Sequence, residues 1–174
     1  MGGSSWSADA YSARSTTRKA SGKDTFAHSS AVKSGKVAAK AHDTLDASKM
    51  KAGKRECRDS DDHPNSKAVF VGLDVTASMS SVPRQMQEKL PLLMGLLLRK
   101  GYLEDPAICL SGIGDVKSDK VPFQVGQFES GIEIDNDITN LYLEGGGGGN
   151  MHESYEMALY FLAHCTSCDA FEKR

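Results

Sequence analysis

The chain lacks the features that would place it in a membrane or in a secretory pathway. It has no run of about 20 apolar residues, the length that a helix needs to cross a bilayer. Its N-terminus has no apolar stretch typical of a secretory signal, and Trp6 stands where a myristoylation signal carries Ser or Thr. These absences predict a cytoplasmic protein without a membrane anchor.

Cysteine is also scarce. The four cysteines are Cys57, Cys109, Cys165 and Cys168, and without a secretory context they are expected to be reduced thiols. Cys165 and Cys168 have the spacing of a zinc or redox pair, and His164 adjoins them. A structural zinc site needs four ligands, however, and no second pair of suitable spacing is present. We therefore expect ordinary small side chains near a helix end.

Large apolar residues are scarce in the first part of the chain. Residues 1–66 are rich in Ser, Ala, Gly and Lys and carry a net positive charge, whereas residues 67–174 hold nearly all the Leu, Ile, Val and Phe and are net negative. A segment that buries few apolar groups cannot offset its ordering entropy. We therefore expect residues 1–66 to be a basic arm, largely disordered or loosely wrapped, and residues 67–174 to form one domain.

Aromatic residues are few in this basic segment. Base stacking in a nucleic-acid complex would have to rely on Trp6, Tyr11 and Phe26, and acidic residues are interspersed among the basic ones. We therefore do not expect nucleic acid to be a partner.

Hydrophobic periodicity after residue 66 predicts alternating strands and helices. Strands are predicted at 67–73, 106–114 and 121–125, and helices at 82–100, 135–143 and 151–164. The first strand is apolar throughout, which predicts burial on both faces. The element order predicts an α/β fold in which a mostly parallel sheet is flanked by helices.

A polar motif follows the first of these strands. Asp74, Thr76 and Ser78 occupy alternate positions immediately beyond it, where chain reversal directs alternate side chains toward one point above the sheet edge. One carboxylate and two hydroxyls are hard oxygen ligands, which suit Mg²⁺ or Mn²⁺. The motif therefore predicts a divalent-metal site.

The motif and its surroundings resemble the von Willebrand factor type A (VWA) domain, whose metal-ion-dependent adhesion site (MIDAS) has the pattern D-x-[ST]-x-S. Asp115 follows the second strand, as an Asp does in one branch of that family, and GGGNMHE at 147–153 is similar to that branch's GGGDxPE loop. The resemblance covers about residues 67–171. Asn150 and His152 depart from it, since Asp and Pro are usual there.

The resemblance implies a Rossmann-like VWA topology and a site for Mg²⁺ or Mn²⁺. The implied metal-site residues are Asp74, Thr76, Ser78, Glu153 and Asp115, with Asp115 acting through a water. In the family a further strand with another site Asp follows the last helix, so we expect the domain to be incomplete at its C-terminus.

The family implies a protein-interaction module and not an enzyme. Similar domains occur in bacterial or phage intracellular assemblies, sometimes with a MoxR-type AAA+ ATPase, so the implied partner is a protein of that kind. There is no expectation of a membrane partner.

Other interpretations remain open for each residue. Asp74 and Ser78 are also favoured helix caps, Glu153 also suits the first turn of a helix, and Asp115 also suits a turn. A magnesium-dependent phosphotransferase of the haloacid dehalogenase type would need a second Asp as general acid where Thr76 stands. A metal-free structural fragment is the third alternative.

Overall fold

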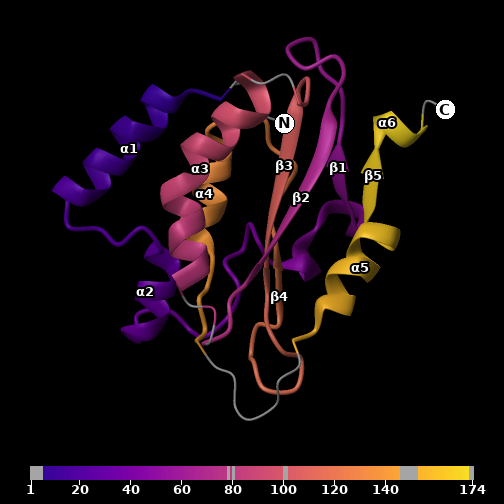
Figure 1. The fold of residues 1–174 in the computed structure, drawn as a ribbon. Coiled ribbons are helices and arrows are strands. Elements are labelled where there is room, and N and C mark those ends of the chain that lie inside the picture. The colour runs from indigo at the N-terminus through magenta and orange to yellow at the C-terminus, as the bar shows by residue number, and fades with distance from the viewer. Residues whose placement is uncertain (1–5, 78, 80, 100–101, 146–152, 173–174) are drawn as a thin grey trace.

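The computed structural model describes residues 6–77, 79, 81–99, 102–145 and 153–172 (Figure 1). In chain order the elements are α1 (Ala8–Ala20), α2 (Ala27–Lys33), η1 (Ala47–Lys49), η2 (Lys51–Gly53), β1 (Arg55–Cys57), β2 (Lys67–Asp74), α3 (Ser81–Arg99), β3 (Pro106–Ile113), β4 (Phe123–Val125), α4 (Glu133–Asn140), α5 (Tyr155–His164), β5 (Thr166–Cys168) and α6 (Asp169–Glu172). The structure confirms a fold of mixed helices and strands, and each strand and helix predicted after residue 66 has a counterpart whose ends differ by a few residues. Positions 100 and 151–152 of the predicted helices lie outside the described residues.

The described strands form two small sheets. In the larger sheet the order is β2-β3-β4, with β2 parallel to β3 over eight residues and β4 antiparallel to β3. In the smaller sheet β1 pairs in parallel with β5, a three-residue strand that the periodicity did not predict. The larger sheet is therefore mixed, with β4 at its edge as the proline at 122 predicts.

Two apolar clusters cover opposite faces of the larger sheet. One joins Leu73 of β2 and Ile108 of β3 to Leu90 of α3 and Ile138 of α4. The other joins residues of β1, β3 and β5 to Phe161 of α5. Figure 1 accordingly places α1 to α4 on one side of β2 and β3, and α5 with the smaller sheet on the other.

The two long strands differ in burial. Every residue of β3 is buried, because β3 lies between β2 and β4. In β2 the prediction of burial on both faces is wrong for most of the strand, since only Leu73 and Asp74 are buried and Ala68 and Gly72 are exposed. The cause is the position of β2 at the end of the strand order.

The expected loose arm is the main difference between the sequence prediction and the structure. Within residues 6–66, Tyr11, Phe26 and Leu45 have at most 4% of their surface exposed, and all three belong to the main core cluster. Tyr11 donates a hydrogen bond of 2.5 Å to the backbone carbonyl of Gln87 in α3. A few well-placed apolar side chains therefore anchor this segment on the domain.

A buried ion pair fixes the same segment to α4. Arg18 of α1 donates through Nη1 and Nη2 to the two carboxylate oxygens of Asp135, at 2.6 and 2.8 Å. The side chain of Asp135 is fully buried, and that of Arg18 is 17% exposed. Two parallel hydrogen bonds in a dry environment make this contact specific as well as attractive.

We expect Arg18→Ala to lower the free energy of unfolding by about 3–5 kcal/mol, because it leaves the carboxylate of Asp135 buried without its charged partner. Arg14→Ala is the matched control, since Arg14 is more exposed and lies 3.8 Å from Asp135. Urea unfolding of both variants measures the difference. A loss of less than about 1 kcal/mol in Arg18→Ala would mean that α1 is only loosely attached.

A second carboxyl, Asp137, is buried without such a partner. A side chain on Gly126 would collide with its carboxylate, and its Oδ2 has no hydrogen-bond partner among the described residues. Burial and, to a smaller extent, the nearby charge of Glu129 raise the pKa of Asp137, Arg55 lowers it, and the result is a pKa of about 7. Asp137 is therefore protonated in the folded chain at mildly acidic pH.

This protonation makes stability depend on pH. The folded pKa of Asp137 lies above its unfolded value, so the stabilisation is fully present below about pH 4 and is lost as the pH rises to about 7. We expect the wild type to lose about 1 kcal/mol per pH unit across this window relative to Asp137→Asn. Urea unfolding at pH 5 and pH 8 measures the difference, and parallel profiles for the two proteins would contradict it.

Candidate metal centre

Three segments that are distant in sequence meet beyond the carboxyl ends of β2 and β3. Because the two strands are parallel and Asp74 pairs with Ile113, both strands end at the same edge of the sheet. The residue before α5 joins them, since Ser154 donates its backbone N–H to the carbonyl of Gly114 at 3.0 Å and accepts from the N–H of Val116 at 3.1 Å. Open α/β sheets commonly bind ligands at this edge.

Asp74 lies at the centre of this edge and is 9% exposed. Its Oδ1 accepts hydrogen bonds from the backbone N–H of Thr76 at 2.9 Å and from the Thr76 hydroxyl at 2.5 Å. Its Oδ2 accepts from the hydroxyl of Tyr155 at 2.9 Å. The carboxylate is thus held in place from two sides, by the turn after β2 and by α5.

The backbone explains why Thr76 faces Asp74. The last ladder bond of the strand pair runs from the N–H of Val75 to the carbonyl of Ile113 at 2.9 Å. A turn follows, in which the N–H of Met79 donates to the carbonyl of Thr76 at 3.2 Å, and α3 begins shortly after it. Thr76 is buried inside this turn. Ser78, the third residue of the motif, lies outside the described residues.

Tyr155 is a site residue that the sequence motif does not contain. It opens α5, and its hydroxyl reaches Asp74 from the opposite side of the edge. The pKa of its phenol is raised to about 12, first by burial, then by the hydrogen bond to Asp74 and by the charges of Asp74 and Glu153. The nearest sequence signal is its position two residues after Glu153, at a helix start.

Glu153 stands at the same end of α5. Its backbone carbonyl accepts from the N–H of Tyr155 at 3.0 Å, and its charge acts on the Tyr155 phenol. Glu153 therefore lies near enough to Tyr155 for its charge to act at this end of α5. The rest of the predicted loop, 146–152, lies outside the described residues.

Asp115 shapes the loop that follows β3. Its Oδ1 accepts from the N–H of Lys117 and its Oδ2 from the hydroxyl of Ser118, both at 2.9 Å, while its own N–H donates to Asp119 at 2.8 Å. These contacts are those of a turn residue. They favour the alternative interpretation of Asp115, and they keep it buried beside the edge.

The cysteines lie on the face of the larger sheet that α5 covers. All four are free, and Cys57, Cys109 and Cys168 are buried in the cluster that contains Phe161. Burial raises the pKa of the Cys57 thiol to about 12 and raises that of Cys109 as well. No group of three or more His, Cys, Asp or Glu side chains arranged for a metal occurs in the part of the chain that the structure describes.

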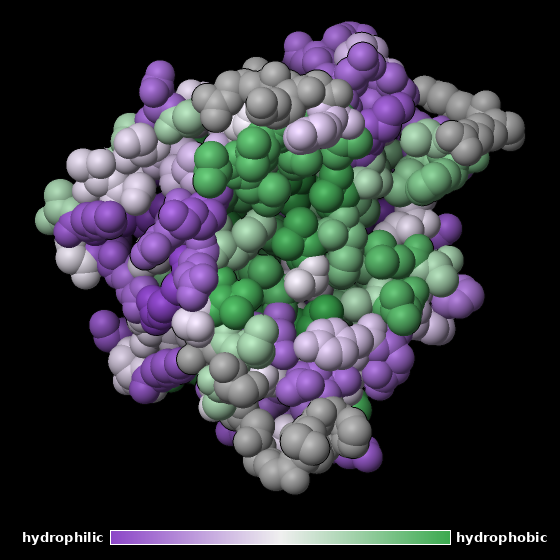
Figure 2. All heavy atoms as spheres, in the orientation of Figure 1, coloured by the Kyte–Doolittle hydropathy of each residue, from purple (hydrophilic) through white to green (hydrophobic). Residues whose placement is uncertain are grey.

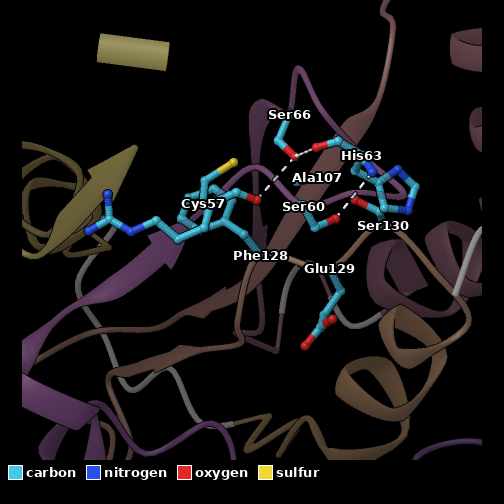
Figure 3. Close-up of a pocket in the computed structure, with 9 residues that line it drawn as sticks. Cys57, Ser60, His63, Ser66, Ala107, Phe128, Glu129 and Ser130 are labelled. Atoms are coloured by element: carbon cyan, nitrogen blue, oxygen red, sulfur yellow. Dashed lines mark hydrogen bonds between the residues drawn. The ribbon is translucent and has the colours of Figure 1, made fainter. Parts of the chain in front are cut away.

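A small cavity between β1, β3 and the segment at Glu129 is a second polar site (Figure 3). His63 lies beside Ser60 and Ser130 there, and its Nδ1 is 3.5 Å from a carboxylate oxygen of Asp105. The cavity holds about 20 Å³, which is room for a single water molecule. It is too small for a substrate, so the sheet edge is a stronger candidate than this cavity.

Within the described residues, no helix is both long enough and apolar enough to span a membrane. Comparison with known proteins gives no relative, since no family model, curated protein or solved structure matches the chain significantly. Function therefore has to be inferred from the site itself.

The hydrogen bond between Tyr155 and Asp74 can be tested by titration. We expect Asp74→Asn to lower the pKa of Tyr155 from about 12 toward its ordinary value near 10, because the variant removes a negative charge and a strong acceptor. NMR of ¹³Cζ-labelled tyrosine follows the ionisation. Glu156→Gln, at the same helix start, is the control that leaves the pKa unchanged. An unchanged pKa in Asp74→Asn would show that the two side chains are apart in solution.

Proposed function

We propose that the chain is a divalent-metal-dependent protein-interaction module of the VWA type. Its site for Mg²⁺ or Mn²⁺ would consist of Asp74, Thr76, Ser78 and Glu153, with Asp115 behind them. The observation that carries the proposal is the meeting of the Asp74–Thr76 turn with the Glu153–Tyr155 helix start at the carboxyl edge of two parallel strands. The β2-β3-β4 order and the helix that follows the motif support a Rossmann-like VWA topology.

The oxygen atoms of Asp74 and Thr76 fit such an ion after a small adjustment. Two neighbouring ligands on Mg²⁺, each about 2.1 Å from it, lie about 3 Å apart. The Thr76 hydroxyl now lies 2.5 Å from Asp74 Oδ1 because it donates a hydrogen bond to that oxygen. Turning the hydroxyl proton away would allow both oxygens to face one cation, without movement of the strands.

The bound ion would offer a coordination position to an oxygen of a partner protein. The charges of the metal-binding residues determine how strongly the ion attracts that oxygen. Asp74 and Glu153 together carry two negative charges, which balance a divalent ion, so the site depends less on an acidic partner than one with a single carboxylate. Tyr155 keeps Asp74 oriented by donating to the second oxygen.

The partner we propose is a protein of a cytoplasmic assembly, such as a MoxR-type AAA+ ATPase, on the basis of the sequence resemblance alone. We do not favour catalysis. Thr76 donates its hydroxyl to Asp74 at the position where a phosphotransferase would need a carboxylic acid.

Calorimetry with Mn²⁺ tests the site. We expect Asp74→Ala to abolish binding and Glu153→Thr to weaken it by roughly 1 kcal/mol or more, on the scale of a lost charged ligand. Glu156→Gln serves as the matched control on the same helix and keeps wild-type affinity. Equal Mn²⁺ affinity in the wild type and in Asp74→Ala would show that Asp74 does not bind the ion and that the proposed site is wrong.

A phosphatase assay on the same proteins separates the enzymatic alternative. We expect no phosphate release that depends on Asp74. If the wild type releases phosphate and Asp74→Ala does not, the chain is a phosphotransferase and the proposal of an interaction module is wrong.

A further inference from the structure

All four cysteines of the chain gather at one apolar cluster, although they come from four separate segments. Cys57 ends β1, Cys109 lies in β3, Cys165 follows α5 and Cys168 ends β5. Three of them belong to the cluster that contains Phe161, and Cys165 packs against it. All four are free thiols, and no group of three or more of them is arranged for a metal. The chemistry open to them is therefore a bond between two thiols.

The register of the smaller sheet places Cys57 directly beside Cys168. Neighbouring strands lie about 4.8 Å apart, so the Cα atoms of the pair fall within the range of roughly 4.4–6.8 Å that disulfides span. Both side chains point into the apolar cluster, where they are 2% and 5% exposed. The two thiols also share a hydrogen bond. The fold therefore holds these two sulfur atoms together.

The pairing that the sequence spacing indicates is less favourable. Cys165 and Cys168 have the C-x-x-C spacing, but the residues between them are extended as part of β5, which separates the two Cα atoms by about 10 Å. Cysteines whose Cα atoms are more than about 7 Å apart cannot be bridged unless the backbone moves. Cys109 lies in the larger sheet, where its thiol donates to the carbonyl of Gly126 at 3.3 Å. The structure thus favours Cys57 over Cys165 as the partner of Cys168.

We propose that Cys57 and Cys168 are a redox modification site, at which hydrogen peroxide converts the two thiols into a reversible disulfide. The thiolate of Cys168 attacks one oxygen of the peroxide, which gives a sulfenic acid and hydroxide. The thiolate of Cys57 then attacks the sulfenic sulfur, so that the S–S bond forms and a second hydroxide leaves. The thiols lose two electrons to the peroxide, and their two protons convert the hydroxides to water. A dithiol reductant reverses the reaction by thiol–disulfide exchange.

The surroundings of the two thiols determine which one reacts first. Burial and, to a smaller extent, the charge of Glu172 raise the pKa of Cys168, whereas a hydrogen bond from the Cys57 backbone and the charge of Arg58 lower it. The pKa of Cys57 is raised to about 12, first by burial and then by the charge of Cys168. Cys168 is therefore the thiol that ionises more readily. Since only the thiolate attacks, oxidation of the folded chain should be slow at neutral pH and faster as the pH rises.

The bond would fasten the segment after α5 to β1. Two strands of three residues now connect these segments, supported by the N–H of Arg55, which donates to the carbonyl of Cys165 at 2.9 Å, and by the ion pair of Arg58 with Asp169 at 2.7 Å. The disulfide would close a loop of about 110 residues, and a loop of this length restricts the unfolded chain strongly. This inference goes beyond the proposed metal-dependent function and does not rest on it.

Peptide mapping of the full chain without reductant, after treatment with hydrogen peroxide, identifies the bond. We expect trypsin to release residues 56–58 joined to residues 121–173, lighter by two hydrogens than the separate peptides. Cys165→Ser is the matched control and should give the same product, because Cys165 contacts the cluster but has no partner in the strand register. Cys168→Ser should give none. A product with an internal bond between Cys165 and Cys168 would overturn the proposal.

Glutathione buffers measure how strongly the fold favours the bond in the wild type, without any substitution. We expect the folded chain to hold the disulfide about 100-fold or more strongly against reduced glutathione than the chain unfolded in urea. Because the linkage is reciprocal, the oxidised chain should melt about 10 °C above the reduced chain, whereas Cys57→Ser should melt at one temperature in both buffers. Equal disulfide stability in the folded and unfolded chains, or equal melting of the oxidised and reduced wild type, would show that the fold does not hold the two thiols together.

Discussion

The parallel pairing of β2 with β3 is the constraint on which the rest of the structure depends. It joins two eight-residue strands from opposite ends of α3 and brings their carboxyl ends to one edge. Asp74 and the loop at Asp115 are neighbours for this reason alone. The same pairing uses one side of β2 completely, and among the described residues no strand pairs with its other side. Figure 2 shows hydrophobic residues gathered in a hollow on this face of the molecule.

The N-terminal segment completes the layer of helices that supports this sheet. Tyr11 and Phe26 fill the core beside α3, and the ion pair of Arg18 with Asp135 ties α1 to α4. Since α3 follows directly from the turn that holds Thr76, the packing of α1 on α3 also restrains the candidate site. The basic segment is thus part of the domain's support and not an appendage.

The sequence predicted what regular periodicity encodes. The strand before Asp74, the helix after it and the order of later elements follow from apolar spacing and turn residues. The N-terminal core residues were missed because Tyr11, Phe26 and Leu45 are isolated in polar sequence, where no period marks them. Tyr155 was missed for a related reason, since one tyrosine at a helix start has no pattern. The apolar run in β2 predicted burial, but composition does not reveal which neighbouring strands are present.

The hydrogen bond from Tyr155 to Asp74 has a thermodynamic consequence for α5. The acceptor of this bond is the carboxylate that would hold a cation in the proposed site. A cation bound there would draw electron density from Asp74 and would thereby weaken the hydrogen bond from Tyr155. Binding at the sheet edge and the anchoring of α5 are then linked, and linkage is reciprocal. Leu159 is exposed on α5. A molecule that binds α5 and shifts it would change the affinity of Asp74 for a cation by some factor. The cation would change the affinity of that molecule for α5 by the same factor.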